Sequence, residues 1–199
     1  MNLNKVLIKF IYGIIFLNII SCSSTKTQYY ILDSAKTSNI NIYNSCKKII
    51  SLEKVDIAKY LDKPNIITRI KPNKLCKTEF HQWSEPLDDN ILRILQQNLS
   101  KQLTTNTVVS YPLLGRLKVN YHVEIKVKQF DVDTFGRSIL KVSWYIYDNN
   151  KKIKQLRNAT YCVQSKNPSN YLSITRSMNK NIEQLSNDIG SSLNKFCQL

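Results

Sequence analysis

Glycine is scarce in this sequence, with only four among 199 residues. Loops that bind nucleotide phosphates need closely spaced glycines, because only glycine lets the backbone approach a phosphate closely. Neither GxGxxG nor GxxxxGKS/T is present, and the hydrolase patterns GxSxG and HExxH are missing as well. We therefore expect neither a nucleotide-binding loop nor one of these hydrolytic sites.

Histidine is also scarce, and no two cysteines have the CxxC spacing. His81 and His122 are the only histidines, so a zinc site built from four Cys or His ligands is not expected. Both occur in strand-like segments, where a single histidine is more often a surface residue than a catalytic one. The sequence gives no reason to expect a metal or a cofactor.

Two pairs of neighbouring carboxylates are the other candidates for acid–base chemistry. Asp88 and Asp89 stand at the predicted start of a helix, where negative charge is favourable beside free N–H groups. Asp131 and Asp133 stand where a strand is predicted to give way to a turn, a position that aspartate favours. Both pairs are interpreted as structural, and the protein is predicted not to be an enzyme.

The apolar run near the N-terminus is too short to cross a membrane. It extends over 11 residues, from Phe10 to Ile20, whereas a membrane-spanning helix needs about 20. Lys5 and Lys9 precede it, and this order of charge and apolar core is typical of a signal peptide.

Ser21-Cys22, directly after this run, resembles a bacterial lipobox, in which lipid is attached to the cysteine and the chain is cut before it. The alternatives are an uncleaved anchor or an ordinary signal peptide with a chance cysteine. Lipoproteins that stay at the inner membrane typically have aspartate directly after the lipidated cysteine. Ser23 stands at that position here, so the resemblance favours the periplasmic face of the outer membrane. The predicted organisation is a signal peptide at 1–21, a lipidated tether at 22–28 and one domain at 29–199. Six extended residues before Tyr29 span about 20 Å, so we expect the domain close to its membrane.

Acidic residues are half as frequent as basic ones, 14 against 29, and the formal net charge is +15. A strongly positive net charge commonly indicates nucleic-acid binding, but a secreted lipoprotein does not encounter nucleic acid. Anionic lipid headgroups are the better candidate partner. Lys, Asn and Ile are abundant throughout, so part of the charge reflects composition alone.

Four cysteines remain after Cys22, namely Cys46, Cys76, Cys162 and Cys197. An even number in an oxidising compartment predicts two disulfides. Three pairings are possible. We favour Cys46–Cys76, which would join an early strand to a hairpin, and Cys162–Cys197, which would join a late strand to the last helix.

The pattern of apolar residues predicts one domain of the α/β class, mixed and α+β-like. Strands are expected at 47–58, in a hairpin formed by 66–70 and 75–81, and in an antiparallel three-strand meander that begins near Lys118 and ends near Gln164. The apolar parity changes between Val127 and Phe130, which indicates a bulge near Lys128. The expected architecture is a mixed central sheet with this meander, packed by two main helices.

The first main helix is predicted to start at about Pro86, since proline disfavours helix at the preceding residue and is suited to a first helical position. Leucines at spacings of three and four then define one apolar face that ends near Leu103. Trp83 is predicted to fill the junction between hairpin and helix. The second helix carries a longer apolar stripe, from Tyr171 to Phe196, which is interpreted as core, with a partner-helix seam as the alternative.

Four segments together resemble the family of ABC-type transport auxiliary lipoproteins, the PqiC-like group. They are YYIL at 29–32, VDIAKYLDKPNIITR at 55–69, WSEPLDDNILRILQQNLSKQL at 83–103 and QLSNDIGSSL at 184–193. Their order and spacing agree with the family, as do the lipobox and the length. The four additional cysteines and Ala58, where many members have proline, depart from it.

The resemblance implies a non-enzymatic outer-membrane lipoprotein that docks an MCE-type lipid transport system. Its implied partners are an MCE-domain protein, the outer membrane through acyl chains and, as an open question, phospholipid or further copies of the chain. The residues of the matching segments that we single out for a structural or partner-binding role are Tyr60, Leu61, Pro64, Arg69, Trp83, Pro86 and Leu87. For Tyr60 and Leu61 both roles stay open: a loop anchor in the core or an apolar contact for a partner. The alternative function is that of an LptE-like assembly lipoprotein, which would bind lipopolysaccharide and a β-barrel protein.

Overall fold

Nine strands and two long helices make up most of the chain in the computed structural model, which describes residues 25–36, 39, 41–43, 46–104, 107–110 and 118–198. The elements are β1 (Gln28–Tyr30), β2 (Ile50–Leu52), β3 (Asp56–Ile57), β4 (Asn65–Lys71), β5 (Lys74–Trp83), α2 (Leu87–Gln102), β6 (Val108–Ser110), β7 (Tyr121–Asp133), β8 (Arg137–Asp148), β9 (Ile153–Gln164) and α3 (Tyr171–Cys197). The predicted signal peptide at 1–21 and Cys22 lie outside the described residues. Among the residues that are described, no helix is long and apolar enough to cross a membrane.

The predicted meander is confirmed as β7, β8 and β9, which pair antiparallel over most of their length. The register of β7 against β8 shifts between Val127 and Gln129, so the bulge expected near Lys128 is present. Because of this shift, Val123, Ile125 and Val127 point into the core before it, and Phe130 and Val132 do so after it.

The other edge of β7 carries three short strands in succession, all parallel to it. β2 pairs with its start, β3 with its middle and β4 with its end. β6 lies outside β2, β5 outside β4, and β1 outside the end of β5. The single strand expected at 47–58 is thus two strands, and β6 was not predicted, whereas the β4–β5 hairpin was.

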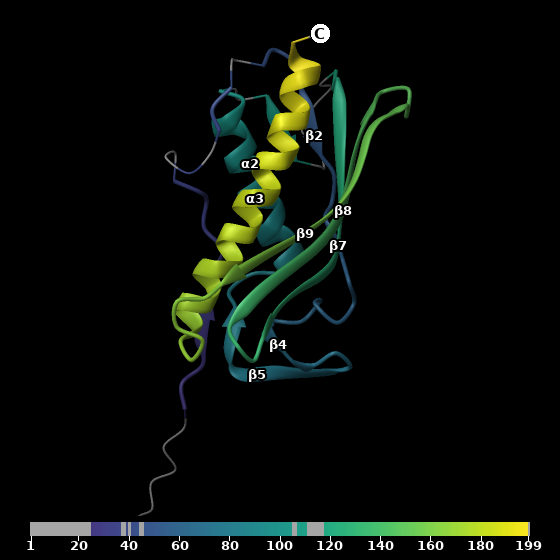
Figure 1. The fold of residues 1–199 in the computed structure, drawn as a ribbon. Helices are drawn as coiled ribbons and strands as arrows, with labels where there is room; N and C mark the ends of the chain where they lie inside the picture. Colours follow the sequence, from purple (N-terminus) through teal and green to yellow (C-terminus); the bar gives the residue numbers. More distant parts are fainter. Residues whose placement is uncertain are drawn as a thin grey trace, which may run out of the picture.

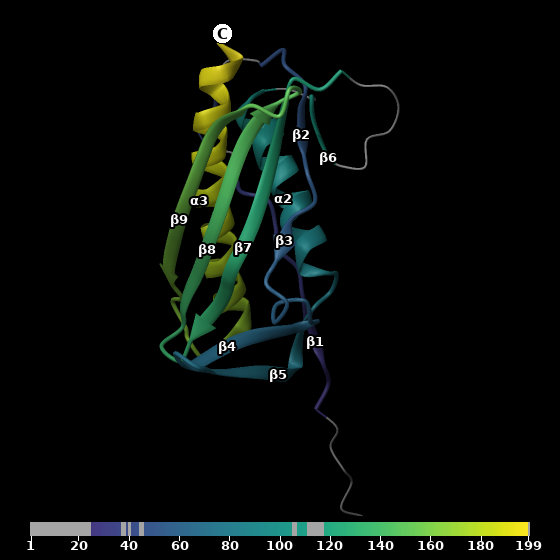
Figure 2. The same ribbon diagram turned by 90° about the vertical axis from the view of Figure 1, so that its right-hand side faces the viewer.

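Both helices cover the same face of the sheet (Figures 1 and 2). α2 begins after Pro86, one residue later than predicted. Leu95, Leu99 and Leu103 of its predicted face are buried together with Ile91 and Ile94, whereas Leu92 is half-buried. In α3 the predicted stripe is core: Ile174, Met178, Ile182, Leu185, Ile189 and Leu193 are all buried. Asn170 caps this helix, since its side chain accepts hydrogen bonds from the N–H groups of Leu172 and Ser173.

The predicted disulfide pairing is wrong. Cys46 is bonded to Cys197, with 5.3 Å between their Cα atoms, while Cys76 and Cys162 are free and exposed. The backbone N–H of Cys46 donates to the carbonyl of Leu103 (3.1 Å), so Cys46 lies where both helices end, opposite the β5 end of the molecule (Figure 1).

Cys76 and Cys162 cannot bond to each other in this fold. Cys76 is opposite Thr68 in β4, and the register continues through Val132 and Ser138 to Val163, the neighbour of Cys162. Four strand spacings separate the two positions by about 19 Å, far beyond the reach of a disulfide. The described residues therefore contain one disulfide, whereas two were predicted.

Candidate functional site

Two of the family-like segments meet on one side of the molecule, where the loop between β3 and β4 contacts the junction of β5 and α2. The N–H of Trp83 donates to the carbonyl of Pro64 at 2.6 Å. The Trp83 side chain is 4% exposed and packs in the core. Segments some twenty residues apart are thus fixed to each other through one tryptophan.

The loop itself is a tight turn held by a buried leucine. The N–H of Leu61 donates to the carbonyl of Ala58 (2.7 Å), and that of Lys63 donates to the carbonyl of Leu61 (2.8 Å). The Leu61 side chain is buried, whereas Asp62, Lys63 and Pro64 are exposed. The burial of Leu61 therefore turns the following three residues toward solvent.

Across from the loop, the residues at the start of α2 are likewise partly buried in the core and partly exposed to solvent. Leu87 is buried, while Ser84 and Pro86 are exposed. The Glu85 carboxylate accepts hydrogen bonds from Arg93 at 2.8 and 3.1 Å, and Arg93 also donates to the carbonyl of Leu32. This network ties the helix start to the chain that leaves β1.

Two shallow hollows flank the loop. One, of about 330 Å³, lies between Asp62–Pro64 and Trp83–Leu87, and the other, of about 460 Å³, lies between Lys54–Lys59, Asp62 and Asp88. Asp62 borders both. We call the exposed residues at this place, Asp62, Lys63, Pro64, Ser84 and Pro86, the loop face.

Behind the loop face, a buried carboxylate binds both Arg69 and Tyr60. Asp131 is fully buried, and its Oδ2 accepts hydrogen bonds from Arg69 Nη2 (2.6 Å), Arg69 Nε (3.1 Å) and the Tyr60 hydroxyl (3.1 Å). Burial, followed by the charge of Asp131, raises the pKa of Tyr60 to about 12. The hydroxyl therefore stays protonated at neutral pH and remains a donor, so the network holds the loop to β4 and β7.

The helix-free face of the sheet carries a second polar cluster. Glu124 accepts hydrogen bonds from the hydroxyls of Tyr145 and Tyr147. His122 contacts Glu53 through Nδ1 (2.7 Å) and stacks on Tyr147. The pKa of Tyr147 is raised, first by burial and then by the hydrogen bond to Glu124.

His81 belongs to an aromatic cluster near the end of β5, two residues before Trp83. Its ring is stacked on Tyr171, with centroids 3.7 Å apart, and its Nδ1 is 2.9 Å from the Tyr30 hydroxyl. Burial lowers the pKa of His81. The cluster connects β1, β5 and the start of α3.

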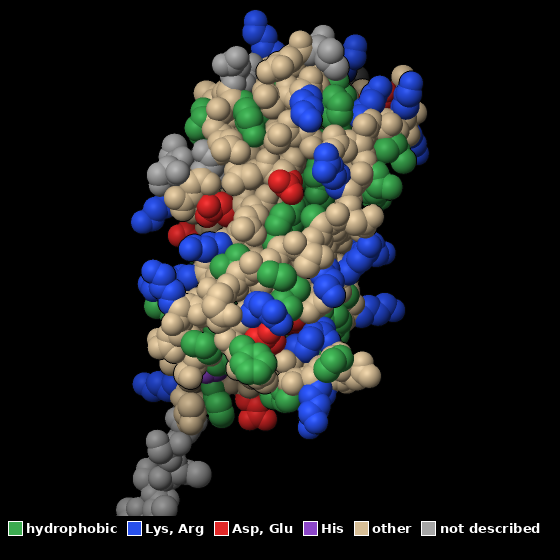
Figure 3. All heavy atoms as spheres, viewed as in Figure 1, with side chains coloured by type: hydrophobic (Ala, Val, Ile, Leu, Met, Phe, Trp, Pro, Cys, Tyr) green, Lys and Arg blue, Asp and Glu red, His purple; other side chains and the backbone are tan. Residues whose placement is uncertain are grey.

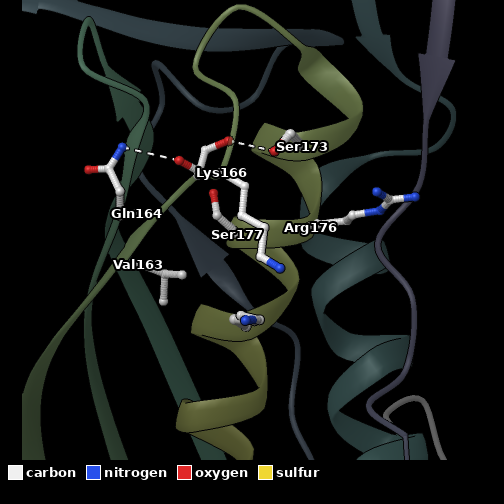
Figure 4. A pocket seen from close by; sticks show the side chains of 8 residues that line it. Val163, Gln164, Lys166, Ser173, Arg176 and Ser177 are labelled. Atoms are coloured by element: carbon white, nitrogen blue, oxygen red, sulfur yellow. Dashed lines mark hydrogen bonds between the residues drawn. The ribbon is translucent and has the colours of Figure 1, made fainter.

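A basic hollow of about 280 Å³ lies between the end of β9 and the first turns of α3 (Figure 4). Its lining includes Lys166, Arg176 and Lys180 and no carboxylate. The Lys166 side chain follows the hollow, whereas that of Arg176 extends away from it. Ser165 and Ser173 join the two walls through their hydroxyls (2.9 Å).

In none of these clusters does a serine or cysteine side chain hydrogen-bond to a histidine, and the imidazole of His81 faces the Tyr30 hydroxyl. Near His122, the Ser51 hydroxyl donates to Glu53 and not to the imidazole, so His122 does not activate this serine. Among the described residues no group of three His, Cys, Asp or Glu side chains is suited to a metal ion. The loop face and its hollows offer shape and backbone polar groups, which suit binding.

The structure brings together all seven residues that we singled out for a structural or partner-binding role, on the loop face and directly behind it. It corrects one interpretation. Asp133 does cap a turn, since its Oδ1 accepts from the N–H groups of Phe135 and Arg137, but Asp131 does not. The available signal was its place between Phe130 and Val132: aspartate is disfavoured inside strands and needs a partner there.

Comparison with known proteins agrees with this fold. A solved structure described as an uncharacterized protein aligns with a TM-score of 0.71 at 16% identity, over 85% of this chain and 99% of that one. Protein XCC0632 from Xanthomonas campestris, of family DUF330, aligns with a TM-score of 0.67 at 13% identity, over 81% and 92%. A PelC dodecamer from Paraburkholderia phytofirmans is more distant, with a TM-score of 0.42 at 11% identity, over 73% and 92%. No curated protein matches the sequence.

The family model of the ABC-type transport auxiliary lipoprotein component matches residues 30–190. This range contains all nine strands and both helices except the ends of β1 and α3. The chain therefore belongs to the ABC-type transport auxiliary lipoprotein family.

Proposed function

We propose that the protein is a non-enzymatic auxiliary lipoprotein of an MCE-type lipid transport system. Lipid on Cys22 anchors it in the periplasmic leaflet of the outer membrane, and the domain docks the transport complex there. Family membership supports the link to an ABC transport system, and the Ser21-Cys22 sequence supports the anchor.

The observation that carries the proposal is the position of the loop face beside the anchored chain. β1 pairs with the end of β5 at Trp83, and the carbonyl of Tyr30 accepts a hydrogen bond from the N–H of Ser84 (2.8 Å). A partner on the loop face is therefore held at a fixed place relative to the tether. Such positioning is a contribution that needs no chemistry, since it raises the local concentration of the partner at the membrane.

The burial pattern also supports a binding role for this face. Leu61, Trp83 and Leu87 belong to the core, while Pro64 and Pro86 between them are exposed. Proline restricts the backbone, so the exposed loop is preorganised and loses little conformational entropy when a partner binds.

A photo-crosslinking residue at Lys63 tests the proposal in the lipidated protein within its own membranes. We expect a crosslink to an MCE-domain protein, and co-purification of its permease and ATPase. The matched control is Lys141, an exposed lysine on β8 on the helix-free face. A crosslink from Lys63 to a large β-barrel or to lipopolysaccharide would instead support the LptE-like alternative. Equal crosslinking from both positions would show that the loop face is not the specific partner-binding surface.

A further inference from the structure

Exposed apolar side chains are concentrated at one end of the domain. Ten large hydrophobic residues of the described chain are exposed. Seven of them lie on β1, the β4–β5 hairpin, the β7–β8 turn or the start of α3, or directly beside these: Tyr29, Ile31, Ile70, Leu75, Phe80, Phe135 and Leu172. The other three are Ile42, Ile153 and Leu156. Exposed apolar side chains that gather on one part of a domain mark a contact with a protein or a membrane.

The elements that carry these side chains form one continuous surface, at the lower end in Figures 1 and 2. Gln164 Nε2 donates to the carbonyl of Phe135 (2.7 Å), and the N–H of Ser165 donates to that of Gly136 (2.9 Å), which joins the β7–β8 turn to the β9–α3 loop. On the other side, the His81–Tyr171 stack joins β5 to α3. We call this surface the tethered end, because β1 and the chain that precedes it leave the domain there.

Basic side chains alternate with the apolar ones at the tethered end. Lys71, Lys74 and Lys77 lie on the β4–β5 hairpin, and Lys166 lies on the β9–α3 loop. None of the ion pairs of the described residues includes any of the four. Glu79 is the one acidic residue of β5. Figure 3 shows green and blue side chains interleaved at this end.

We propose that the tethered end is a membrane-contact surface for anionic phospholipid, with its aromatic and aliphatic side chains in the interface and its lysines on the headgroup phosphates. The inference rests on the proposed lipid anchor, since Cys22 lies six residues before Gln28 and six extended residues span about 20 Å. Of the possible occupants, a bilayer is the one that the tether brings to this end. Apolar side chains next to lysines are typical of interfacial binding, and the cations complement anionic lipid.

This contact fixes the orientation of the domain. With the tethered end on the leaflet, the helix ends joined by Cys46–Cys197 point away from the membrane (Figure 1). The loop face then lies at the side of the domain near the bilayer surface, accessible to a partner that arrives from the periplasm.

Vesicle binding by the mature chain with Cys22→Ser, which lacks the acyl anchor, tests the proposal. The probe is vesicles of phosphatidylcholine with phosphatidylglycerol, compared with pure phosphatidylcholine. We expect co-sedimentation with the anionic vesicles that weakens as salt screens the lysines. Phe135→Ser combined with Leu172→Ser, at positions 76% and 51% exposed, should reduce binding by about tenfold or more without changing the melting temperature.

The matched control is Ile153→Ser combined with Leu156→Ser, both 60% exposed and both on the first half of β9, far from the tethered end. This variant should bind like the parent protein. Equal loss in both variants, or no loss in the first, would overturn the proposal. Loss of self-association in place of vesicle binding would overturn it too, because a second copy would then occupy the surface. The assay contains no partner protein, so its failure and that of the Lys63 crosslinking experiment are independent.

Discussion

Arg69 donates two hydrogen bonds to one oxygen of Asp131, from Nη2 at 2.6 Å and from Nε at 3.1 Å. The two residues are 62 positions apart and join β4 to β7 directly behind the loop face. Asp131 is fully buried while Arg69 reaches solvent. A buried charge is costly unless it is paired, so the position of the loop depends on this arginine.

Removing the arginine should therefore destabilise the domain strongly. Arg69→Ala leaves the Asp131 carboxylate buried without a cation, and we expect the free energy of unfolding to fall by about 3–5 kcal/mol. The control is Arg137→Ala, which breaks the pair between Arg137 at the start of β8 and Asp133 at the end of β7. The Arg137 side chain is 56% exposed, and such pairs contribute less than about 1 kcal/mol. Equal losses in urea unfolding of the two variants would contradict this account of Asp131.

The disulfide should join the segment before β2 to the end of α3. Non-reducing peptide mapping is expected to find Cys46 bonded to Cys197, and Cys76 and Cys162 as free thiols. The bond closes a loop of 151 residues, so Cys197→Ser should lower the free energy of unfolding by up to about 5 kcal/mol in the chain-entropy model. Cys76→Ser and Cys162→Ser are the controls, since both residues are exposed, and should leave stability unchanged. Mapping that finds Cys46 on Cys76 would show that the fold is different.

Trp83 should act through packing. Trp83→Ala removes a side chain that is 4% exposed, and a loss of about 3–5 kcal/mol is expected from thermal or urea unfolding. Trp83→Phe should recover a large part of that loss because it refills most of the cavity. If Trp83→Ala melts like the parent protein but no longer binds the partner, the tryptophan is a contact residue and its structural role is refuted.

His81 should make stability depend on pH in the acidic range. Its pKa is lowered from 6.5 by burial, so the unfolded chain takes up the proton more readily than the folded one. The fold then loses stability as the pH falls through about 6.5 and below, and is unaffected well above it. Protonation also places a second N–H where Nδ1 faces the Tyr30 hydroxyl. His81→Gln should reduce the drop in melting temperature between pH 7.5 and 5.5, and an unchanged drop would exclude His81 as its source.

The elements with strong local periodicity were predictable from the sequence. α2, α3 and the three-strand meander carry apolar repeats of 3.6 or 2 residues over more than ten positions each, and the bulge at Lys128 is visible as a change of parity. Pro86 likewise fixed the helix start to within one residue.

Contacts between residues far apart in the sequence were not predictable in this way. β2, β3 and β6 have two or three residues each and gain their place only by pairing parallel to a distant strand. The same limit applies to Cys46 and Cys197, which meet because α3 crosses the whole molecule (Figure 1). It applies also to Asp131, whose partner lies 62 residues away. In each case the deciding contact is set by the three-dimensional fold, and no short window of sequence contains it.

The central claim is that the domain works by position, as a lipid-anchored docking protein. The most direct measurement compares the parent protein with Cys22→Ser carrying an ordinary cleavable signal, in cells whose resistance to membrane stress depends on the transport system. We predict a folded, soluble periplasmic protein that still binds the MCE partner through the loop face, together with a loss of resistance, because the local concentration at the membrane is lost. Full resistance with the soluble form would contradict the docking account and would favour a soluble lipid carrier or an enzyme.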